Sequence, residues 1–289
     1  MTIPATTALK AKLAERRALL VPGVSNALSA LIAADLGYEA VYVTGAGVTN
    51  MNLGMPDLGL ITLSELAEHV RAIREIVALP IIVDADTGFG NAVNVYRTVK
   101  VLEHAGASAI QLEDQVFPKK CGHFSGKEVI PLEEMLPKIR AAVDARQDPD
   151  LLIVARTDAR AVVGIDAAIE RAAAFVEAGA DVTFVEAPET VEEMRAIPSR
   201  LTVPQLANLV VGGKTPVLPQ SELQRMGFAV ALYANVALQS AVKAMQTVLG
   251  ALLRDGDLDA VRDQVATFAE RQRLVQKPLF DALEQKYRP

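Results

Sequence analysis

The chain has 289 residues, of which 51% are apolar and 22% charged, and its 35 acidic and 29 basic side chains give a net charge of -6. This composition excludes a disordered segment, which needs low hydrophobicity and high net charge. The negative charge also excludes a basic nucleic-acid scaffold, and a single cysteine, Cys121, excludes a disulfide framework.

The N-terminal segment has no apolar stretch before a small-residue cleavage site, so we expect no secretory signal there. Its pattern predicts a short amphipathic helix capped by Thr6 or Thr7. The longest weakly polar run, 228–242, is interrupted by Asn235 and Gln239. It is shorter than the roughly 20 residues that a membrane span needs. We therefore expect a soluble protein without membrane or nucleic-acid partners. A lone cysteine fits a reducing compartment, so we expect a cytoplasmic location.

Eight short apolar runs recur along the chain, and each is followed by a turn and a segment of helical periodicity. Strands that alternate with helices indicate β-α-β units and a parallel sheet. Eight units predict an α/β fold of the closed (β/α)8, TIM-barrel type, in one domain of residues 1–289. The expected strands are 20–24, 40–44, 80–84, 109–113, 151–155, 182–186, 203–207 and 228–233, and the clearest helices are 63–77, 94–105, 133–145 and 165–178.

A doubly wound sheet is the alternative to the barrel. It usually has fewer strands, and its fingerprint G-x-G-x-x-G does not follow the first strand here. The barrel is therefore the preferred prediction. Behind the eighth strand the sequence predicts a C-terminal helical extension, 241–289, with helices over 241–254 and 258–287. This extension either covers the barrel bottom or packs against a neighbouring subunit.

Polar side chains end five consecutive predicted strands, at the carboxyl ends where the active sites of barrels lie. Asp84 and Asp86 end the third strand, and alternation points both side chains to one side. Strand ends also meet water, but that does not explain so many acids on adjacent strands, whose mutual repulsion calls for a cation. Oxygen ligands favour a hard ion such as Mg2+ or Mn2+. The predicted set is Asp84, Asp86 and Glu113, and the following strands end in Arg156, Glu186 and Asn208.

The loop after the fourth strand carries the cysteine. Cys121 is flanked by Lys119, Lys120 and His123, a positive environment that favours the thiolate. The glycines of this loop, Gly122 among them, would serve as hinges of a mobile lid. The alternative is a charged, solvated loop in which the cysteine is incidental.

A turn of small residues follows the second strand and could present backbone N–H groups to an anion. It comprises Thr44, Gly45 and Ala46, and as a stand-alone motif it is weak. Asp57 lies in a Gly/Pro loop that could reach the same end of the barrel.

Taken together, these motifs resemble the isocitrate lyase and phosphoenolpyruvate mutase superfamily over roughly residues 10–250. The Lys-Lys-Cys-Gly-His run, 119–123, is the most specific of them. The others match in order along the chain: Thr44-Gly45-Ala46, Asp57, 84–90, Glu113-Asp114-Gln115, 155–158, Glu186 and Asn208.

The resemblance implies chemistry next to a 2-oxo acid, with a small 2-hydroxy or 2-oxo carboxylic acid as the ligand. It implies that Asp86 binds Mg2+, for which Mn2+ could substitute, with Asp84 and Glu113 joined through water. The metal and the backbone of the Thr44–Ala46 turn would hold a pyruvate-like unit. The remaining contacts with substrate would come from Gly122, His123, Arg156, Glu186 and Asn208.

The same resemblance assigns proton transfer to the loop. Cys121 would protonate the departing carbon acid in a retro-aldol cleavage, for which Mg2+ lowers the pKa of the substrate hydroxyl. The base that accepts the hydroxyl proton is open between Tyr42 and Lys119, and Asp57 completes the set of catalytic candidates.

Cys121 also favours one branch of the superfamily. The phosphonomutase and decarboxylase branches do without this cysteine, so the sequence predicts a carbon–carbon lyase of the short type, similar to methylisocitrate or 2,3-dimethylmalate lyases. Methylisocitrate lyases carry an Arg where this chain has Lys120, and another Arg where it has Gln239. Gln239 cannot form a bidentate ion pair, so a dicarboxylic 2-alkylmalate is preferred over a tricarboxylate.

Three alternatives remain: a phosphonomutase of the phosphoenolpyruvate or carboxyphosphonoenolpyruvate type, an oxaloacetate hydrolase or decarboxylase, and a catalytically idle barrel. The hydrolase reading is weakened by Ala234, which lacks the hydroxyl expected in that segment. For the assembly, the resemblance implies a homotetramer, a dimer of dimers that exchange their last helix, which would explain the surplus helix.

Overall fold

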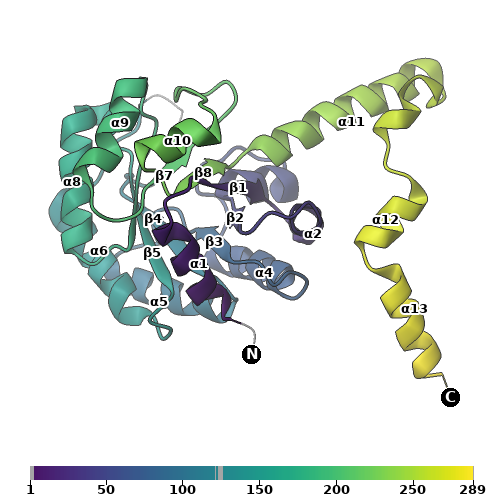
Figure 1. The fold of residues 1–289 in the computed structure, drawn as a ribbon, viewed down its shortest axis with the longest axis horizontal. Coiled ribbons are helices and arrows are strands. Elements are labelled where there is room, and N and C mark those ends of the chain that lie inside the picture. Colours follow the sequence, from purple (N-terminus) through teal and green to yellow (C-terminus); the bar gives the residue numbers. More distant parts are fainter. Residues whose placement is uncertain (1–2, 121, 123–125, 289) are drawn as a thin grey trace.

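The computed structural model describes residues 3–120, 122 and 126–288, and Cys121 and His123 lie outside this part of the chain. Its centre is a sheet of eight parallel strands in the order β6-β5-β4-β3-β2-β1-β8-β7 (Figure 1). A single bridge between Thr183 and Gln205 joins β6 to β7, so the barrel is nearly closed. The predicted (β/α)8 fold is confirmed. The strands are β1 (Leu19–Val24), β2 (Val41–Val43), β3 (Ile81–Asp84), β4 (Ala109–Glu113), β5 (Leu152–Thr157), β6 (Val182–Val185), β7 (Leu206–Asn208) and β8 (Val230–Tyr233).

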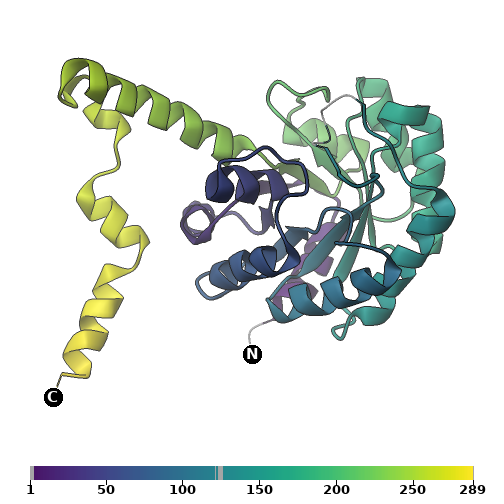
Figure 2. The same ribbon diagram turned by 180° about the vertical axis from the view of Figure 1, so that it is seen from behind.

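Helices surround the barrel and cover the outer faces of the strands (Figure 2). Their starts are set by side chains that bond the free N–H groups of the first turn, as Thr62 and Asn91 do in capping boxes. The covering helices are α2 (Ala27–Asp35), α4 (Leu63–Arg74), α5 (Ala92–His104), α6 (Leu132–Ala145), α8 (Ile165–Glu177), α9 (Val191–Arg200) and α10 (Gln220–Met226). Short helical segments lie in the loops, namely α3 (Gly45–Val48), a π-helical turn (Thr49–Leu53) and α7 (Arg160–Val163).

The interior of the barrel is filled by apolar side chains from alternate positions of the strands, such as Val21, Ile82 and Val154. The N-terminal helix α1 (Ala5–Ala14) belongs to the same cluster, since its Leu9 and Leu13 are fully buried against these residues. This helix therefore closes the bottom of the barrel. The interpretation that the C-terminal extension might do so was wrong.

The C-terminal extension projects away from the barrel (Figures 1 and 2). It consists of α11 (Val236–Asp255), a 3-10 turn (Asp259–Gln264), α12 (Phe268–Leu274) and α13 (Lys277–Lys286). The first helix starts before the predicted residue 241, and the predicted helix over 258–287 is broken into separate pieces. An ion pair of 2.6 Å between Arg273 and Asp35 ties α12 to α2.

Helix α11 is longer and more apolar than the sequence patterns suggested. Within the described part of the chain it is the one helix with the length, 20 residues, and the mean hydropathy, 1.3, of a possible membrane span. Only 6% of that apolar window is buried. Most of this apolar window is therefore exposed in the single chain.

Candidate active site

The predicted site residues that the structure describes gather at the carboxyl ends of the strands. Most of them line a cavity of about 30 Å³, which has room for only a few water molecules. A four-carbon dicarboxylic acid would not fit without movement of its walls. The lining comes from several strands and the loops that follow them: Tyr42, Thr44, Ala46, Asp57, Asp84, Lys119, Lys120, Gly122, Arg156, Phe184, Glu186, Asn208, Leu232, Ala234 and Asn235.

The carboxylates of Asp84 and Asp86 converge, as the alternation of side chains predicted. A Cβ atom placed on Gly45 would lie 3.2 Å from Asp86 Oδ1 and 3.4 Å from Asp84 Oδ2. The N–H of Gly45 itself donates to Asp84 Oδ2 at 3.3 Å. Asp86 has a left-handed backbone with φ of 48°, a costly conformation that functional sites often retain. Both carboxylates thus lie next to Gly45, which has no side chain.

Lys119 supplies the positive charge in this cluster. Its Nζ lies 2.5 Å from Asp57 Oδ1 and 2.8 Å from Asp86 Oδ1. Burial alone would lower the pKa of Lys119, but the surrounding carboxylates, Asp86 first, raise it well above its ordinary value. Burial raises the pKa of Asp86 to about 7, with Asp84 and Asp57 adding to the rise and Lys119 opposing it. Lys119 is therefore a protonated ammonium group that is ion-paired with Asp57 and Asp86.

These residues fit a magnesium ion. Among the residues that the structure describes, no three acidic or histidine side chains form a ready set of metal ligands. The converging pair Asp84 and Asp86 meets the need of Mg2+, which keeps several waters and takes one or two carboxylates directly. Glu113 is fully buried at the end of β4, where Gln115 Nε2 donates to its Oε1 at 3.0 Å. Its place is that of a ligand acting through water, and all three assignments stay predictions.

The raised pKa of Asp86 predicts that the affinity for Mg2+ depends on pH. Mg2+ must displace the proton that Asp86 holds below its pKa of about 7. Affinity for Mg2+ should therefore increase up to tenfold per pH unit as pH rises toward 7, at about 1.4 kcal/mol per unit, and level off above it. Titration calorimetry between pH 5.5 and 8 measures this. An affinity that does not change with pH below 7 would contradict the assigned environment of Asp86.

Arg156 forms a second charged cluster at the end of β5. Its Nε lies 2.9 Å from Asp158 Oδ2 and 3.5 Å from Glu113 Oε2, and its Nη2 lies 3.3 Å from Glu186 Oε2. The guanidinium also stacks on the ring of Phe184, 5.1 Å from its centroid. Because Arg156 is buried among carboxylates, a substrate carboxylate would have to compete with them for it.

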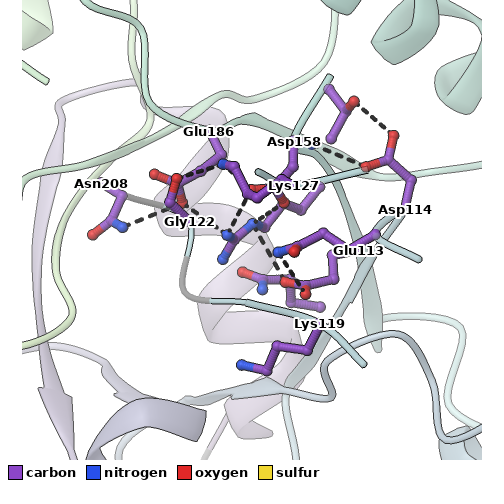
Figure 3. Close-up of polar contacts among 12 residues, drawn as sticks. Glu113, Asp114, Lys119, Gly122, Lys127, Asp158, Glu186 and Asn208 are labelled. Atoms are coloured by element: carbon purple, nitrogen blue, oxygen red, sulfur yellow. Dashed lines mark hydrogen bonds and ion pairs between the residues drawn. The ribbon is translucent and has the colours of Figure 1, made fainter. Parts of the chain in front are cut away.

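Asn208 and Gly122 complete this side of the cavity (Figure 3). Asn208 Nδ2 donates to Glu186 Oε2 at 3.3 Å, and its Oδ1 is buried without a hydrogen-bond partner in the described part of the chain. A Cβ on Gly122 would lie 2.4 Å from Arg156 Nη2, so no other residue fits there without displacement. The loop backbone at Gly122 is thus in contact with the predicted carboxylate-binding side chains.

Tyr42 lies deeper, inside the barrel. Its Oη donates to Gln111 Oε1 at 2.7 Å, and Gln111 Nε2 donates to Asp84 Oδ1 at 3.0 Å. Burial raises the pKa of Tyr42 well above 10. Tyr42 and Lys119 thus both carry their protons here, and each would act as a base only after transferring its proton. The choice between them stays open.

Three residues that the sequence analysis did not place in the site belong to its surroundings: Gln111, Lys127 and Asp158. Gln111 could have been found, since it alternates with Glu113 in an otherwise apolar strand and so faces the barrel interior. Lys127 and Asp158 form a buried ion pair of 2.6 Å across a long sequence separation, which no local pattern predicts. The turn at Thr44 proves to be a helix start, with Thr44 as the N-cap of α3.

Several known proteins are similar to this chain in sequence. The family described as phosphoenolpyruvate phosphomutase matches residues 9–253. A 2,3-dimethylmalate lyase of Eubacterium barkeri is 48% identical over 258 residues, which cover 89% of each chain. A 2-methylisocitrate lyase of Aeropyrum pernix is 49% identical over 260 residues, covering 90% of this chain and 83% of the relative.

Solved structures share the fold at nearly full length. A crystal structure of 2,3-dimethylmalate lyase has a TM-score of 0.92 and 34% identity, covering 99% of this chain and 96% of that one. Oxaloacetate acetylhydrolase with the inhibitor 3,3-difluorooxalacetate has a TM-score of 0.90 and 34% identity, covering 97% and 95%. Phosphonopyruvate hydrolase with oxalate and Mg2+ has a TM-score of 0.89 and 32% identity, covering 99% of each chain. The barrel, the ordered set of polar strand ends and these similarities together show that the chain belongs to the PEP mutase/isocitrate lyase superfamily.

Proposed function

We propose that the protein is a Mg2+-dependent lyase that cleaves the carbon–carbon bond of a substituted malate. The products would be a 2-oxo acid such as pyruvate and a carboxylic acid. The observation that carries this proposal is the convergence of Asp84 and Asp86 beside Gly45, where Asp84 lines one small cavity together with the buried guanidinium of Arg156. The relatives named as lyases support the reaction type.

Each residue has a part in this reaction. Bound to Asp86, and through water to Asp84 and Glu113, Mg2+ would stabilise negative charge on the oxygens of the 2-oxo acid. Arg156 and Asn208 would orient the substrate carboxylate, and the guanidinium of Arg156 is supported from below by the ring of Phe184. Cys121 would protonate the departing carbon acid, and the small volume of the cavity would limit competition from bulk water.

We propose a dicarboxylic 2-alkylmalate as the substrate. Leu232, Phe184 and Ala234 give the cavity apolar surface on one side, which suits alkyl groups. Gln239 lies on the exposed surface of α11 and donates to the carbonyl of Val211 at 3.2 Å, so in this chain it does not reach the cavity. Among the described residues that line the cavity, the cations are Arg156, Lys119 and Lys120, and Gln239 adds none for a third carboxylate.

An assay of 2-oxo acid release over a panel of 2-alkylmalates, 2-methylisocitrate and oxaloacetate tests the proposal directly. Mg2+-dependent release of the matching 2-oxo acid from alkylmalates, pyruvate where the 2-alkyl group is methyl, is the expected result. Release of oxalate and acetate from oxaloacetate would indicate a hydrolase instead. Phosphorus NMR with phosphonopyruvate would reveal a mutase, and inactivity on every compound would favour an idle barrel.

We further propose that the chain assembles with copies of itself by exchanging α11, within a homotetramer in the cytoplasm. The apolar side chains of α11, Val242, Met245 and Leu249, recur at helical spacing and are exposed. A groove of about 430 Å³ opens on the barrel surface where the helix after β8 would pack, beside Leu20, Leu36 and Tyr38. The outer face of α2 adds exposed Leu28 and Ile32. An exchanged α11 would cover both surfaces.

The assembly makes its own prediction. Replacing Leu249 with Asp, L249D, should release smaller species because a charge would be buried in the exchanged interface. Light scattering coupled to size-exclusion chromatography measures the mass. The matched control is Ser240→Asp, an exposed polar position on the opposite face of the same helix. A mass that L249D and the control share with the unaltered protein would contradict the exchange.

A further inference from the structure

The loop that carries Cys121 has an ordered base. Val116 N–H donates to Glu128 O at 2.9 Å, and Gln115 pairs with Val129 in an antiparallel bridge. Arg171 holds the two ends of this base together, since its Nε donates to Asp114 Oδ2 at 2.6 Å and its Nη2 donates to Ile130 O. Both ends of the loop are therefore fixed to the barrel.

Lys127 directly precedes Glu128 of this base, and its side chain extends into the protein. Its side chain is 1% exposed and its Nζ lies 2.6 Å from Asp158 Oδ1 (Figure 3). The same Nζ donates a hydrogen bond to the carbonyl of Gly122. One buried ammonium thus links the end of β5 to the loop backbone at the point where that backbone contacts Arg156 and Glu186.

Asp158 is itself held rigidly. Its backbone N–H donates to Asp114 Oδ1 at 2.9 Å, and its Oδ2 accepts from Arg156 Nε at 2.9 Å. Arg156 and Lys127 lower the pKa of Asp158 despite its burial, so it is a carboxylate shared by two cations. The bond to Gly122 therefore has a fixed anchor, and charge-assisted hydrogen bonds of this kind are among the stronger ones.

We propose that Lys127 is a positioning residue that holds the Gly122 backbone against Arg156 and Glu186. Through the peptide bonds of Gly122 it would constrain the neighbouring residues Cys121 and His123, which the proposed function assigns to proton transfer and carboxylate binding. The inference rests on that function for its catalytic consequence. The structural part of the inference, the tether from Asp158 through Lys127 to Gly122, does not rest on the proposed function.

The lone cysteine supplies a reporter for this tether. In Lys127→Met, a neutral side chain of similar length, Asp158 keeps Arg156 as its counterion, so the fold should be retained. Alkylation of Cys121 by iodoacetamide is followed by mass spectrometry over a range of pH, which separates the thiol pKa from the limiting rate. Losing one charge-assisted hydrogen bond should raise the limiting rate roughly tenfold or more. kcat should fall about 10²-fold with little change in KM, since misplacement by about 1 Å is that costly.

The matched control is Lys138→Met. Lys138 is also a buried lysine at this end of the barrel, and its Nζ donates to the carbonyl of Thr87 at 3.3 Å without contacting Gly122. This variant removes a buried ammonium from the same end of the barrel without touching the tether, so it should alkylate as the unaltered protein does. Lys127→Arg, which keeps the charge and the donors, should recover part of kcat.

A limiting alkylation rate in K127M that equals that of K138M would overturn the proposal. If K127M does not fold, Lys127→Gln compared with Lys138→Gln gives the same test with a shorter polar side chain. Because alkylation needs no substrate, its result stands whether or not lyase activity is found. A failure of the lyase assay with a faster alkylation of K127M would reject the proposed function and keep the tether.

Discussion

Replacing Cys121 with Ser is expected to lower kcat by about 10²- to 10⁴-fold, the usual contribution of a positioned acid or base. Serine fills nearly the same space, but its hydroxyl ionises far less readily than a thiol and cannot exchange a proton with a carbon acid near neutral pH. Binding of Mg2+ and pyruvate should remain nearly intact, because Asp84, Asp86 and Arg156, which are proposed to hold the metal and a carboxylate, lie on or directly after the strands.

Steady-state kinetics of 2-oxo acid release and calorimetry with Mg2+ and pyruvate give the two measurements. Undiminished turnover in C121S would remove the assigned role of Cys121. Turnover of phosphonopyruvate that survives the substitution would point to the mutase branch, whose chemistry has no carbon acid to protonate.

The second large effect is expected at Asp86. Asp86→Asn keeps the shape of the side chain and removes the carboxylate that is proposed to bind Mg2+ directly, so kcat/KM should fall about 10³-fold or more, a loss of several kcal/mol. The metal affinity should fall with it. Stability should not: burial raises the pKa of Asp86 to about 7, which means that its charge is disfavoured in the folded metal-free protein.

This opposition between activity and stability separates a metal ligand from a structural carboxylate. Above pH 7 the metal-free D86N protein should melt at the same temperature as the unaltered one, or higher, because a neutral amide avoids the cost of a buried charge. Asp144→Asn, on the exposed side of α6, serves as a control for removing one negative charge. Full activity in D86N, or a collapse of its melting temperature, would contradict the assignment.

The barrel and most of its acids could be predicted from the sequence because both depend on local patterns. Strands buried on both faces read as aliphatic runs, and their carboxyl ends carry the polar residues, as at Asp84, Glu113 and Asn208. Boundaries were less certain. The seventh strand begins at Leu206 and not at 203, since Pro204 has no N–H to give to a ladder and contributes only its carbonyl, which accepts from Thr183 at 3.1 Å.

Features that depend on packing between distant segments could not be predicted. The ammonium of Lys119 between Asp57 and Asp86 requires two loops to meet, and the pair of Lys127 with Asp158 requires a loop to fold back on a strand. The direction of the C-terminal extension was also missed. Its apolar periodicity shows that a face must be covered, but it does not say by what.

The contact between the loop and the strand ends has a consequence for stereochemistry. The floor of the cavity is made by strand ends that hold Asp84 and Arg156, and Gly122 of the loop rests against Arg156 on another side. If Cys121 delivers the proton from the loop side, as proposed, the reacting carbon is protonated on one face. Cleavage of a malate with one methyl group on C3, run in deuterium oxide, should then release propionate that carries its new deuterium in a single configuration.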